Sequence, residues 1–229
     1  MMHATRIGIL GGTFDPVHHG HVDAALAAKE TLKLNEVLFV PARLTPHKPP
    51  ARHVSGYHRF AMLALATIGY PTFRVSDLEL RSSKPSYTSL TLRQLSLSGY
   101  DPTQLFFIAG TDTFAQIAQW HDYPDVLKQS HFVVVSRPGF PVSKLFNDMP
   151  TLADRMQPAA AFTKNNADQR ETTAIWLVDV ATRNVSSSTI RNRLANGQSV
   201  NEMVPSAITT YITSQRLYAE PYIVSRSHE

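Results

Sequence analysis

Short apolar segments recur along the chain, and most are followed by turn residues and then by a helical pattern of apolar positions. Each segment is rich in β-branched and aromatic residues and has the length of a strand buried on both faces. Alternation of such strands with helices predicts an α/β fold with a doubly wound parallel sheet. The predicted strands lie at 7–10, 37–40, 73–75, 105–109, 132–135 and 175–178, and the predicted helices at 22–33, 56–67, 88–98, 112–120, 187–196 and 206–214.

Two stretches lack a clear period and are predicted to be irregular. Residues 41–53 (PARLTPHKPPARH) make a Pro-rich, basic loop after the second strand, and residues 138–173 make a long polar insertion. The chain has no internal repeat, and its 229 residues lie between one and two average domains. We expect a single domain over 1–229.

Composition narrows the class of protein. Hydrophobic residues make up 43% of the chain and charged residues 17%, without any low-complexity tract, which excludes a disordered or fibrous protein. The formal net charge of +4 suits an anionic ligand, but the 22 Lys and Arg residues are scattered, so nucleic-acid binding is not favoured. Because no apolar stretch approaches the roughly 18 residues of a membrane-spanning helix, we expect a cytoplasmic protein without membrane partners.

Cysteine is absent from the sequence. Disulfide bonds, thiolate catalysis and cysteine-based zinc or iron–sulfur sites are therefore excluded. Any metal that this chain binds must use oxygen or nitrogen ligands.

The stretch GGTFDPVHHGH (11–21) follows the first predicted strand, at the edge where open parallel sheets bind ligands. Gly11 and Gly12 carry no Cβ, which lets a ligand approach the backbone closely. His18 and His21 are three positions apart, so both face one side of the first helical turn if a helix begins near Gly20. The positive end of that helix favours an anionic ligand.

Other interpretations of this stretch have to be weighed against a phosphate site. Its spacing fits neither the G-x-G-x-x-G of dinucleotide-binding oxidoreductases nor the G-K-[ST] of a P-loop. A zinc site using His18, His21 and Asp15 is incomplete, since the Glu of H-E-x-x-H is missing. Histidines on the surface and glycines that only turn the chain are the simplest alternatives, and we expect His19 to be exposed.

A second candidate segment, VSSSTIR (185–191), follows the last predicted strand. Successive hydroxyl groups at a helix start can cap free N–H groups and, together with those groups, hold phosphate oxygens. Arg191 adds a fork-shaped cation that suits phosphate. Taken alone, the segment favours a plain helix cap, because a Ser-rich helix start is common.

Smaller features follow the other strands. His47 and Lys48 lie in the basic loop after the second strand, and Gly110 precedes Thr111 and Asp112, whose carboxylate suits sugar hydroxyls. Two further residues lie in comparable places. Trp120 suits either stacking on a planar ring or filling the core, with the core favoured when no context is given, and Arg137 follows a strand on the predicted ligand side.

The combination resembles the nucleotidylyltransferase superfamily, whose markers are [HT]-x-G-H in the first βα loop and S-[ST]-x-I-R near the end. More narrowly, it is similar to the bacterial nicotinate mononucleotide adenylyltransferases. The matching segments run through nearly the whole chain in order. They are GGTFDPVHHGH (11–21), PHK (46–48), HRFAML (58–63), SYTSLTL (86–92), FIAGTDTFAQIAQW (107–120), SRPG (136–139), VSSSTIR (185–191) and VPSAITTYI with LY (204–218).

The resemblance implies a Rossmann-like α/β fold with a C-terminal helical portion at about 186–218. It also implies a reaction in which ATP and nicotinate mononucleotide give nicotinate adenine dinucleotide and pyrophosphate, a late step of NAD biosynthesis. The attack is in line, without a covalent enzyme intermediate, and Mg²⁺ enters with ATP, carried mainly by the phosphates and water rather than by protein ligands. ATP and nicotinate mononucleotide are the implied partners, and no oligomeric state follows.

The resemblance implies roles for those residues of this chain that match the family's motifs in position. The implied catalytic residues are His18, His21, Lys48 and Arg191. The implied ATP-binding residues are Gly11, Gly12, Thr13, Phe14, His18, His21, Gly110, Asp112, Ser187, Ser188 and Arg191. The mononucleotide is implied to contact Thr88 and His121 through backbone N–H groups that receive its carboxylate, Trp120 through ring stacking, and Arg137.

The chain departs from the family pattern at a few positions. Leu90 stands where many relatives carry Asp, Ser188 keeps the hydroxyl of a frequent Thr, and residues 140–173 match no family motif. Sister enzymes that use nicotinamide mononucleotide or phosphopantetheine are the nearest alternatives, and Trp120 with the SYT segment favours a pyridine nucleotide. A nucleotide-sensing or RNA-binding regulator is the alternative from another class, and the intact motif residues argue against it.

Overall fold

The computed structural model describes residues 5–44, 54–162 and 172–219. The strands of this part form one parallel sheet in the order β3-β2-β1-β4-β5-β7-β6. The chain starts in the middle of the sheet and winds outward in both directions from β1 and β4, as expected of a doubly wound fold. The strands are β1 (Ile7–Gly12), β2 (Glu36–Pro41), β3 (Phe73–Val75), β4 (Leu105–Gly110), β5 (His131–Val135), β6 (Met156–Pro158) and β7 (Ile175–Val178).

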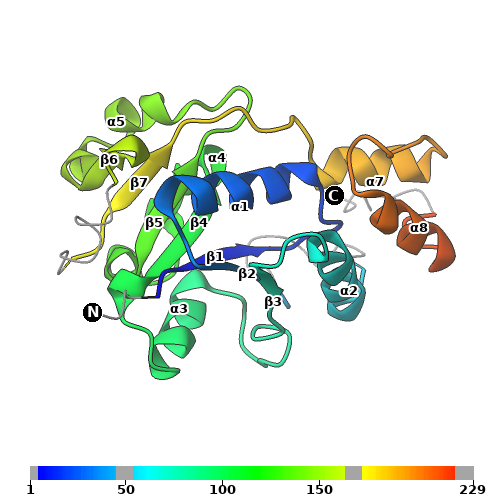
Figure 1. Cartoon of the computed structure of the whole chain (residues 1–229), viewed down its shortest axis with the longest axis horizontal. Coiled ribbons are helices and arrows are strands. Elements are labelled where there is room, and N and C mark those ends of the chain that lie inside the picture. The colour runs from blue at the N-terminus through cyan, green and yellow to red at the C-terminus, as the bar shows by residue number, and fades with distance from the viewer. Residues whose placement is uncertain (1–4, 45–53, 163–171, 220–229) are drawn as a thin grey trace, which may run out of the picture.

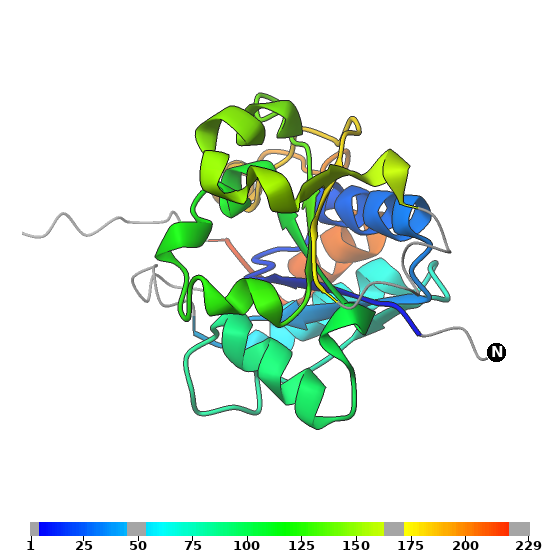
Figure 2. The ribbon, with the colours of Figure 1, turned by 90° about the vertical axis from the view of Figure 1, so that its left-hand side faces the viewer.

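Helices cover both faces of the sheet, and α1 and α3 lie on opposite sides of it (Figure 1, Figure 2). The two helices at the C-terminal end, α7 and α8, extend beyond one end of the sheet next to α2 (Figure 1). The α-helices are α1 (His19–Leu32), α2 (Gly56–Thr67), α3 (Thr88–Leu97), α4 (Thr111–Phe114), α5 (Leu145–Asp148), α7 (Ser187–Ala195) and α8 (Ser206–Ser214).

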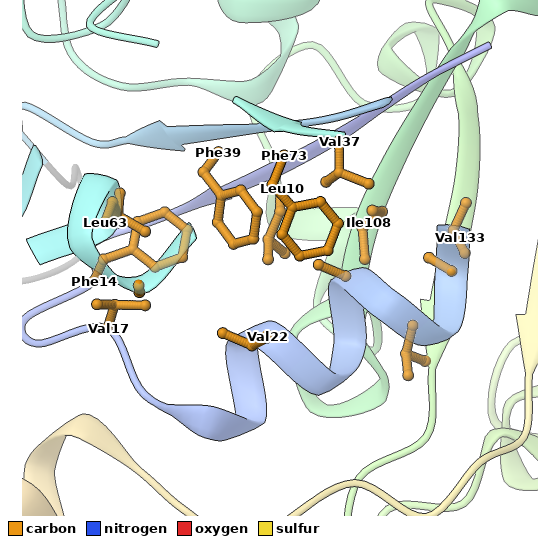
Figure 3. Packing of buried hydrophobic residues seen from close by; sticks show 14 of the residues in the cluster. Leu10, Phe14, Val17, Val22, Val37, Phe39, Leu63, Phe73, Ile108 and Val133 are labelled. Carbon is orange, nitrogen blue, oxygen red and sulfur yellow. The ribbon is translucent and has the colours of Figure 1, made fainter. Parts of the chain in front are cut away.

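The strands alternate their side chains between two separate cores. On the α1 face, Leu10, Phe39 and Val22 belong to one buried cluster, which Figure 3 shows from close by. On the α3 face, Ile9 and Leu92 belong to the other. A strand that is buried on both faces reads as a continuous apolar run, which is why the sequence pattern located these strands correctly.

The C-terminal helices belong to the α1-face core. Ile190 of α7 and Ile208 of α8 are fully buried in the same cluster as Val22 of α1, and Val204 between the two helices is buried there as well. The predicted C-terminal helical portion is therefore packed against the sheet domain through its apolar side chains.

The prediction of one helix over 112–120 is wrong. The α4 helix ends at Phe114, and a 3₁₀ turn at Ile117–Gln119 follows it. Phe114, Ile117 and Trp120 recur every three residues, which is the period of a 3₁₀ helix, and Phe114 and Ile117 are fully buried. A three-residue spacing of apolar side chains fits an α-helix and a 3₁₀ turn alike, so the sequence pattern does not tell the two apart.

The described part of the insertion is more regular than its polar sequence predicts. Short helical turns and α5 lead to β6 (Met156–Pro158), which adds an edge strand next to β7. The β6 strand has only three residues and ends in Pro158, so it is too short to show a periodic pattern in the sequence. Its place at the sheet edge agrees with the proline, which is tolerated in a strand chiefly at an edge. No helix in the described ranges is long and apolar enough to cross a membrane.

Candidate active site

A cleft of about 630 Å³ opens beside the carboxyl ends of β1, β4 and β5. Most of the predicted site residues that the structure describes line it. From the first loop and α1 come Gly11, Gly12, Thr13, Phe14, His18 and His21; from the other elements come Thr88, Gly110, Trp120, His121, Arg137, Ser187 and Arg191. Lys48 lies outside the described residues, and Asp112 and Ser188 do not line the cleft.

The loop between β1 and α1 carries the predicted histidines. The α1 helix begins at His19, three residues before the predicted helix 22–33 and close to the start near Gly20 on which the pairing of the histidines depends, and His18 is its N-cap residue. The imidazole rings of His18 and His21 stack with their centroids 3.7 Å apart, as the three-residue spacing predicts. We expected His19 to be exposed, but it is partly buried. Its backbone N–H donates to the carbonyl of Met203, which brings the C-terminal portion next to it.

A hydrogen bond fixes how His21 carries its proton. The backbone N–H of His18 donates to Nδ1 of His21 at 3.2 Å. A neutral His21 ring that accepts at Nδ1 holds its proton at Nε2. Nδ1 of His18 is buried and has no hydrogen-bond partner among the described residues. A buried polar atom without a partner is costly in a finished core and therefore suggests a ligand that is still to come.

Both imidazoles are held neutral by their surroundings in the cleft. Burial lowers the pKa of His18 to about 3, and the charges of Arg137 and His19 act in the same direction. Burial also lowers the pKa of His21 well below its usual value, with His18 and Arg137 adding to the effect. Since the desolvated rings resist protonation among cations, an anion in the cleft would reverse the electrostatic part of this shift.

The hydroxyl groups of the VSSSTIR segment make different contacts. Ser186 caps α7 by accepting from the backbone N–H of Thr189 at 3.1 Å. Ser187 donates to the carbonyl of Pro16 at 2.9 Å, and Arg191 donates to the carbonyl of Asp15 at 2.7 Å. One hydroxyl therefore makes the plain helix cap, while its neighbours tie α7 to the histidine loop. Ser188 instead lies 3.0 Å from the hydroxyl of Ser186.

The end of β4 sets a second pair of charges beside the cleft. Arg137 forms an ion pair with Asp112 at 3.1 Å, and Oδ1 of Asp112 is buried without a partner among the described residues. A Cβ on Gly110 would lie 2.7 Å from that Oδ1 and 2.8 Å from Cδ of Arg137. Any other residue at position 110 would therefore displace one or both of these side chains.

Aromatic side chains line the other end of the cleft. The rings of Trp120 and Phe107 pack edge to face, with their centroids 5.8 Å apart. Trp120 is partly buried, and it contributes both to the core and to the lining of the cleft. The His121 ring stacks on Tyr87 at 4.3 Å and forms a hydrogen bond to the hydroxyl of Ser89 at 3.0 Å. This end presents flat apolar surface next to the start of α3.

Comparisons with known proteins place this cleft in a family. Residues 9–193 match the model of the cytidylyltransferase-like family. A relative from Shewanella pealeana named "Probable nicotinate-nucleotide adenylyltransferase" is 36% identical over 93% of this chain and 95% of its own. One with the same name from Cronobacter sakazakii is 37% identical over 91% of this chain and 93% of its own.

The chain belongs to the nicotinate-nucleotide adenylyltransferase family. Solved structures agree with this membership in fold. Plasmodium falciparum nicotinic acid mononucleotide adenylyltransferase, complexed with NaAD, aligns with a TM-score of 0.68 at 18% identity over 93% of this chain and 97% of its own. The complex of the same enzyme with APC gives a TM-score of 0.67 over the same shares of the two chains. The Rossmann-like fold expected from the resemblance is thereby confirmed.

Several side chains that support the adenylyltransferase cleft carry no role in the sequence prediction. Arg59 donates to the carbonyl of Thr13 at 2.7 Å, and Tyr218 donates to the carboxylate of Asp15 at 2.6 Å. Arg183 pairs with Asp23 of α1 at 2.6 Å and lines the cleft. Arg59 and Tyr218 fall in family-like segments, HRFAML and LY, and this was the only signal for them.

The site combines imidazole and guanidinium groups with two carboxylates, Asp15 and Glu79, which accept hydrogen bonds from Tyr218 and Thr91. Within the described ranges, no three His, Asp or Glu side chains are grouped as metal ligands, so His18, His21 and Asp15 do not form the alternative zinc site. The carboxylate of Asp15 is engaged with Tyr218. Cationic and N–H donors of this kind fit phosphate oxygens, and Mg²⁺ prefers oxygen ligands.

Proposed function

We propose that this chain transfers the adenylyl group of ATP to nicotinate mononucleotide, giving nicotinate adenine dinucleotide and pyrophosphate. The stacked, neutral pair of His18 and His21 at the N-terminus of α1 carries the proposal. Arg191 lines the same cleft, which continues to Trp120. Membership of the nicotinate-nucleotide adenylyltransferase family supports the same reaction.

The reaction requires no protein nucleophile. A phosphate oxygen of the mononucleotide attacks the α-phosphorus of ATP, and the bond from that phosphorus to the bridging oxygen breaks, so pyrophosphate leaves on the opposite side. Two anionic reactants have to meet, and the protein's task is to position them and neutralise their charge. Accordingly, the cleft gathers cations and N–H donors rather than a catalytic carboxylate.

His18 and His21 are assigned to the ATP phosphates. Nε2 of His21 carries the proton in the neutral ring, because Nδ1 accepts from the backbone of His18. Triphosphate bound at the start of α1 would raise the depressed pKa of both rings, since an adjacent anion favours the charged form. Either as N–H donors or as imidazolium ions, the two rings stabilise charge that moves onto the leaving pyrophosphate.

Arg191 and Ser187 are assigned to the opposite wall of the phosphate site, and Arg137 to the mononucleotide. Arg191 donates one guanidinium N–H to the carbonyl of Asp15, and this hydrogen bond holds the Arg191 side chain in the cleft. Mg²⁺ enters as part of the substrate MgATP, where it screens the phosphate charge. Gly110, Asp112 and the stretch 11–14 are assigned to the adenosine side of ATP.

The aromatic end of the cleft is assigned to the mononucleotide. Trp120 offers a face for the pyridine ring, and backbone N–H groups near Thr88 and His121 receive its carboxylate. Thr88 is the first residue of α3, where N–H groups are free and the helix dipole favours an anion. An amide in place of the carboxylate loses this charge-assisted contact, so the acid is preferred.

A product assay with three acceptors tests the proposal. The purified chain is incubated with MgATP and either nicotinate mononucleotide, nicotinamide mononucleotide or phosphopantetheine, and both pyrophosphate and the adenylylated product are measured. We expect the highest kcat/KM with nicotinate mononucleotide. Product mainly from another acceptor would assign the chain to that sister activity. No product from any acceptor, together with measurable RNA binding, would favour a regulator instead.

A further inference from the structure

We propose that Tyr218 is a positioning residue for adenylyl transfer, because its hydroxyl fixes Asp15 and thereby the loop that carries His18 and His21. The inference rests on the proposed function and adds a role for the C-terminal segment that follows α8. Tyr218 does not line the cleft and acts through Asp15, which does line it, and through the histidine loop. The contacts of that loop, the burial of Asp15 and the backbone of residues 216–218 support it independently.

The histidine loop is held from three distant parts of the chain. Its backbone carbonyls at Thr13, Asp15 and Pro16 accept hydrogen bonds from Arg59 of α2 and from Arg191 and Ser187 of α7, at 2.7, 2.7 and 2.9 Å. These contacts fix the backbone alone. The carboxylate of Asp15 is the loop's polar side-chain anchor, and Tyr218 donates to its Oδ1 at 2.6 Å.

Because Asp15 is buried, its carboxylate depends on hydrogen-bond donors from the protein. Asp15 is only 1% exposed, and a buried carboxylate needs good donors because it has lost its water. Burial and the neighbouring Asp15 carboxylate raise the pKa of Tyr218 above its usual value, although Arg191 and Arg59 oppose the shift. The phenol therefore stays protonated at physiological pH and always presents its hydrogen to Asp15.

The backbone around Tyr218 adopts an unusual conformation to deliver this phenol. The α8 helix ends at Ser214, and Arg216 and Tyr218 then have φ angles of 50° and 61°. Arg216 caps α8 in the usual left-handed way, with its N–H donating to the carbonyl of Thr213 at 3.2 Å, whereas Tyr218 takes the left-handed region beyond the cap, where residues with a side chain are uncommon. Leu217 between them packs on the α1-face core, and its N–H donates to the carbonyl of Ile212 at 3.0 Å. The turn is thereby locked with the phenol aimed at Asp15.

Two residues separate Asp15 from the first catalytic candidate. Pro16 and Val17 lead directly to His18, and Val17 is fully buried. Because His18 is the N-cap of α1 and stacks on His21, a shift of Asp15 changes the position of both rings. A displacement of about 1 Å at a reacting centre is enough to cost about 10²-fold in rate.

A pair of tyrosine variants separates positioning from ordinary stabilisation. Tyr218→Phe removes only the hydroxyl that reaches Asp15. Tyr211→Phe is the matched control, since the Tyr211 hydroxyl is also in the C-terminal portion and makes a hydrogen bond to Nδ1 of His58 at 2.9 Å, away from the histidine loop. For both variants we measure the melting temperature, kcat, and the KM values of MgATP and nicotinate mononucleotide.

We expect both variants to fold and to melt at slightly lower temperature than the wild type. Tyr218→Phe lowers kcat about 10-fold and raises the KM of MgATP, whereas its KM for nicotinate mononucleotide stays within about twofold, as expected of misplaced phosphate ligands. Tyr211→Phe keeps all three kinetic values within about twofold. Wild-type kcat and KM in Tyr218→Phe, or equal losses in the two variants, would overturn the inference.

Asp15→Asn tests the same hydrogen bond from its other end. It weakens the bond by replacing the charged acceptor with a neutral amide oxygen, and it keeps the shape of the side chain. If the two residues act as one unit, the double variant Asp15→Asn with Tyr218→Phe has a kcat within about twofold of the slower single variant, because coupled effects do not add. Multiplicative losses in the double variant would contradict this coupling.

The inference and the proposed function fail in different ways. Absence of dinucleotide synthesis by the wild-type chain would sink the proposed function. In that event, affinity for a non-cleavable MgATP analogue is measured for the same two tyrosine variants. Weaker binding by Tyr218→Phe alone supports the positioning role, and unchanged binding by Tyr218→Phe overturns it.

Discussion

Histidine is useful at this site because the fold keeps both rings neutral and close together. His18 and His21 stack at 3.7 Å, and their pKa values are depressed by burial before any other cause. The first ring leaves a buried nitrogen without a partner among the described residues, and the second has its tautomer fixed by the backbone. Two such rings are preorganised for the proposed contact with the ATP phosphates, and preorganisation is the condition for strong electrostatic stabilisation.

Removal of either ring should therefore be costly. We expect His18→Ala and His21→Ala each to lower kcat by about 10² or more, the scale of losing one preorganised donor. His19→Ala is the matched control, because His19 lies between them in sequence and does not line the cleft. Steady-state kinetics of the three purified variants checks this. Near wild-type turnover of His21→Ala would remove the phosphate role.

Arg191 provides a test of geometry at constant charge. Arg191→Lys keeps the positive charge but cannot hold the carbonyl of Asp15 and a phosphate with one planar fork. We expect a higher KM for MgATP and a lower kcat, measured by initial rates over a range of ATP concentrations. Unchanged values for both would show that a point charge is sufficient at this position.

The burial of His18 also makes stability depend on pH. The unfolded imidazole takes up a proton near pH 6.5, whereas folding lowers the pKa of His18 to about 3. Between these values the unfolded state binds more protons, so the stability of the folded state is fully present above pH 6.5 and falls as the pH is lowered. From pH 7 to pH 5 this single group should cost about 2 kcal/mol.

Chemical denaturation of wild type and His18→Gln at the two pH values measures this loss. We expect the wild type to lose about 2 kcal/mol more than the variant, because glutamine does not titrate. Equal losses in the two proteins would mean that His18 titrates normally in the folded chain.

At the scale of elements, the carboxyl end of β4 brings charge to the cleft. Gly110 lets Asp112 and Arg137 approach the end of the strand, and a Cβ there would fall within 2.8 Å of side-chain atoms of both. Because flexible side chains can move aside, we expect a Cβ at this position to reduce the activity more than the free energy of unfolding. The prediction concerns the junction of β4 with α4.

Gly110→Ala should lower kcat/KM for MgATP about 10-fold while changing the free energy of unfolding by about 1 kcal/mol, the lower limit for overpacking. Gly69→Ala is the control, since its added methyl group meets nothing within 4 Å. Kinetics and thermal unfolding of both variants check the prediction. A large loss of stability with normal kinetics would place the role of Gly110 in folding alone.

The elements also show how far sequence patterns reach. The six predicted strands and the pairing of His18 with His21 follow from local periodicity and spacing, and both are confirmed. The prediction of one helix over 112–120 is wrong because apolar side chains at every third residue fit an α-helix and a 3₁₀ turn alike. The hydrogen bond from Tyr218 to Asp15 spans 203 positions. No local pattern specifies such a contact, because only the completed fold brings its two ends together.

At the scale of the whole molecule, Ser187 and Arg191 of α7 line the cleft, and both C-terminal helices share the α1-face core. Figure 1 shows the two helices beyond one end of the sheet. Ile208 and Ile212 of α8 are buried in the cluster that contains Val22 of α1. A common core joins their unfolding to that of the sheet. The prediction of a single domain over 1–229 therefore has a direct thermodynamic consequence.

We expect one cooperative calorimetric transition that Ile212→Ala shifts as a whole, with a loss of about 2–5 kcal/mol for a buried large-to-small change. Ile68→Ala is the control, because Ile68 is 76% exposed, and it should change stability by no more than about 0.5 kcal/mol. Two separate transitions, with only one of them moved by Ile212→Ala, would show that the C-terminal helices unfold as an independent unit.

The central claim is that this cleft moves the adenylyl group of ATP to nicotinate mononucleotide. The most direct measurement uses ATP labelled with ³²P at either the α or the γ position, in the presence of Mg²⁺ and nicotinate mononucleotide. We predict that the α label appears in the dinucleotide and the γ label in pyrophosphate, and that both products fall about 10²-fold in His21→Ala. Transfer of the γ label to the mononucleotide, or no labelled dinucleotide at all, would contradict adenylyl transfer.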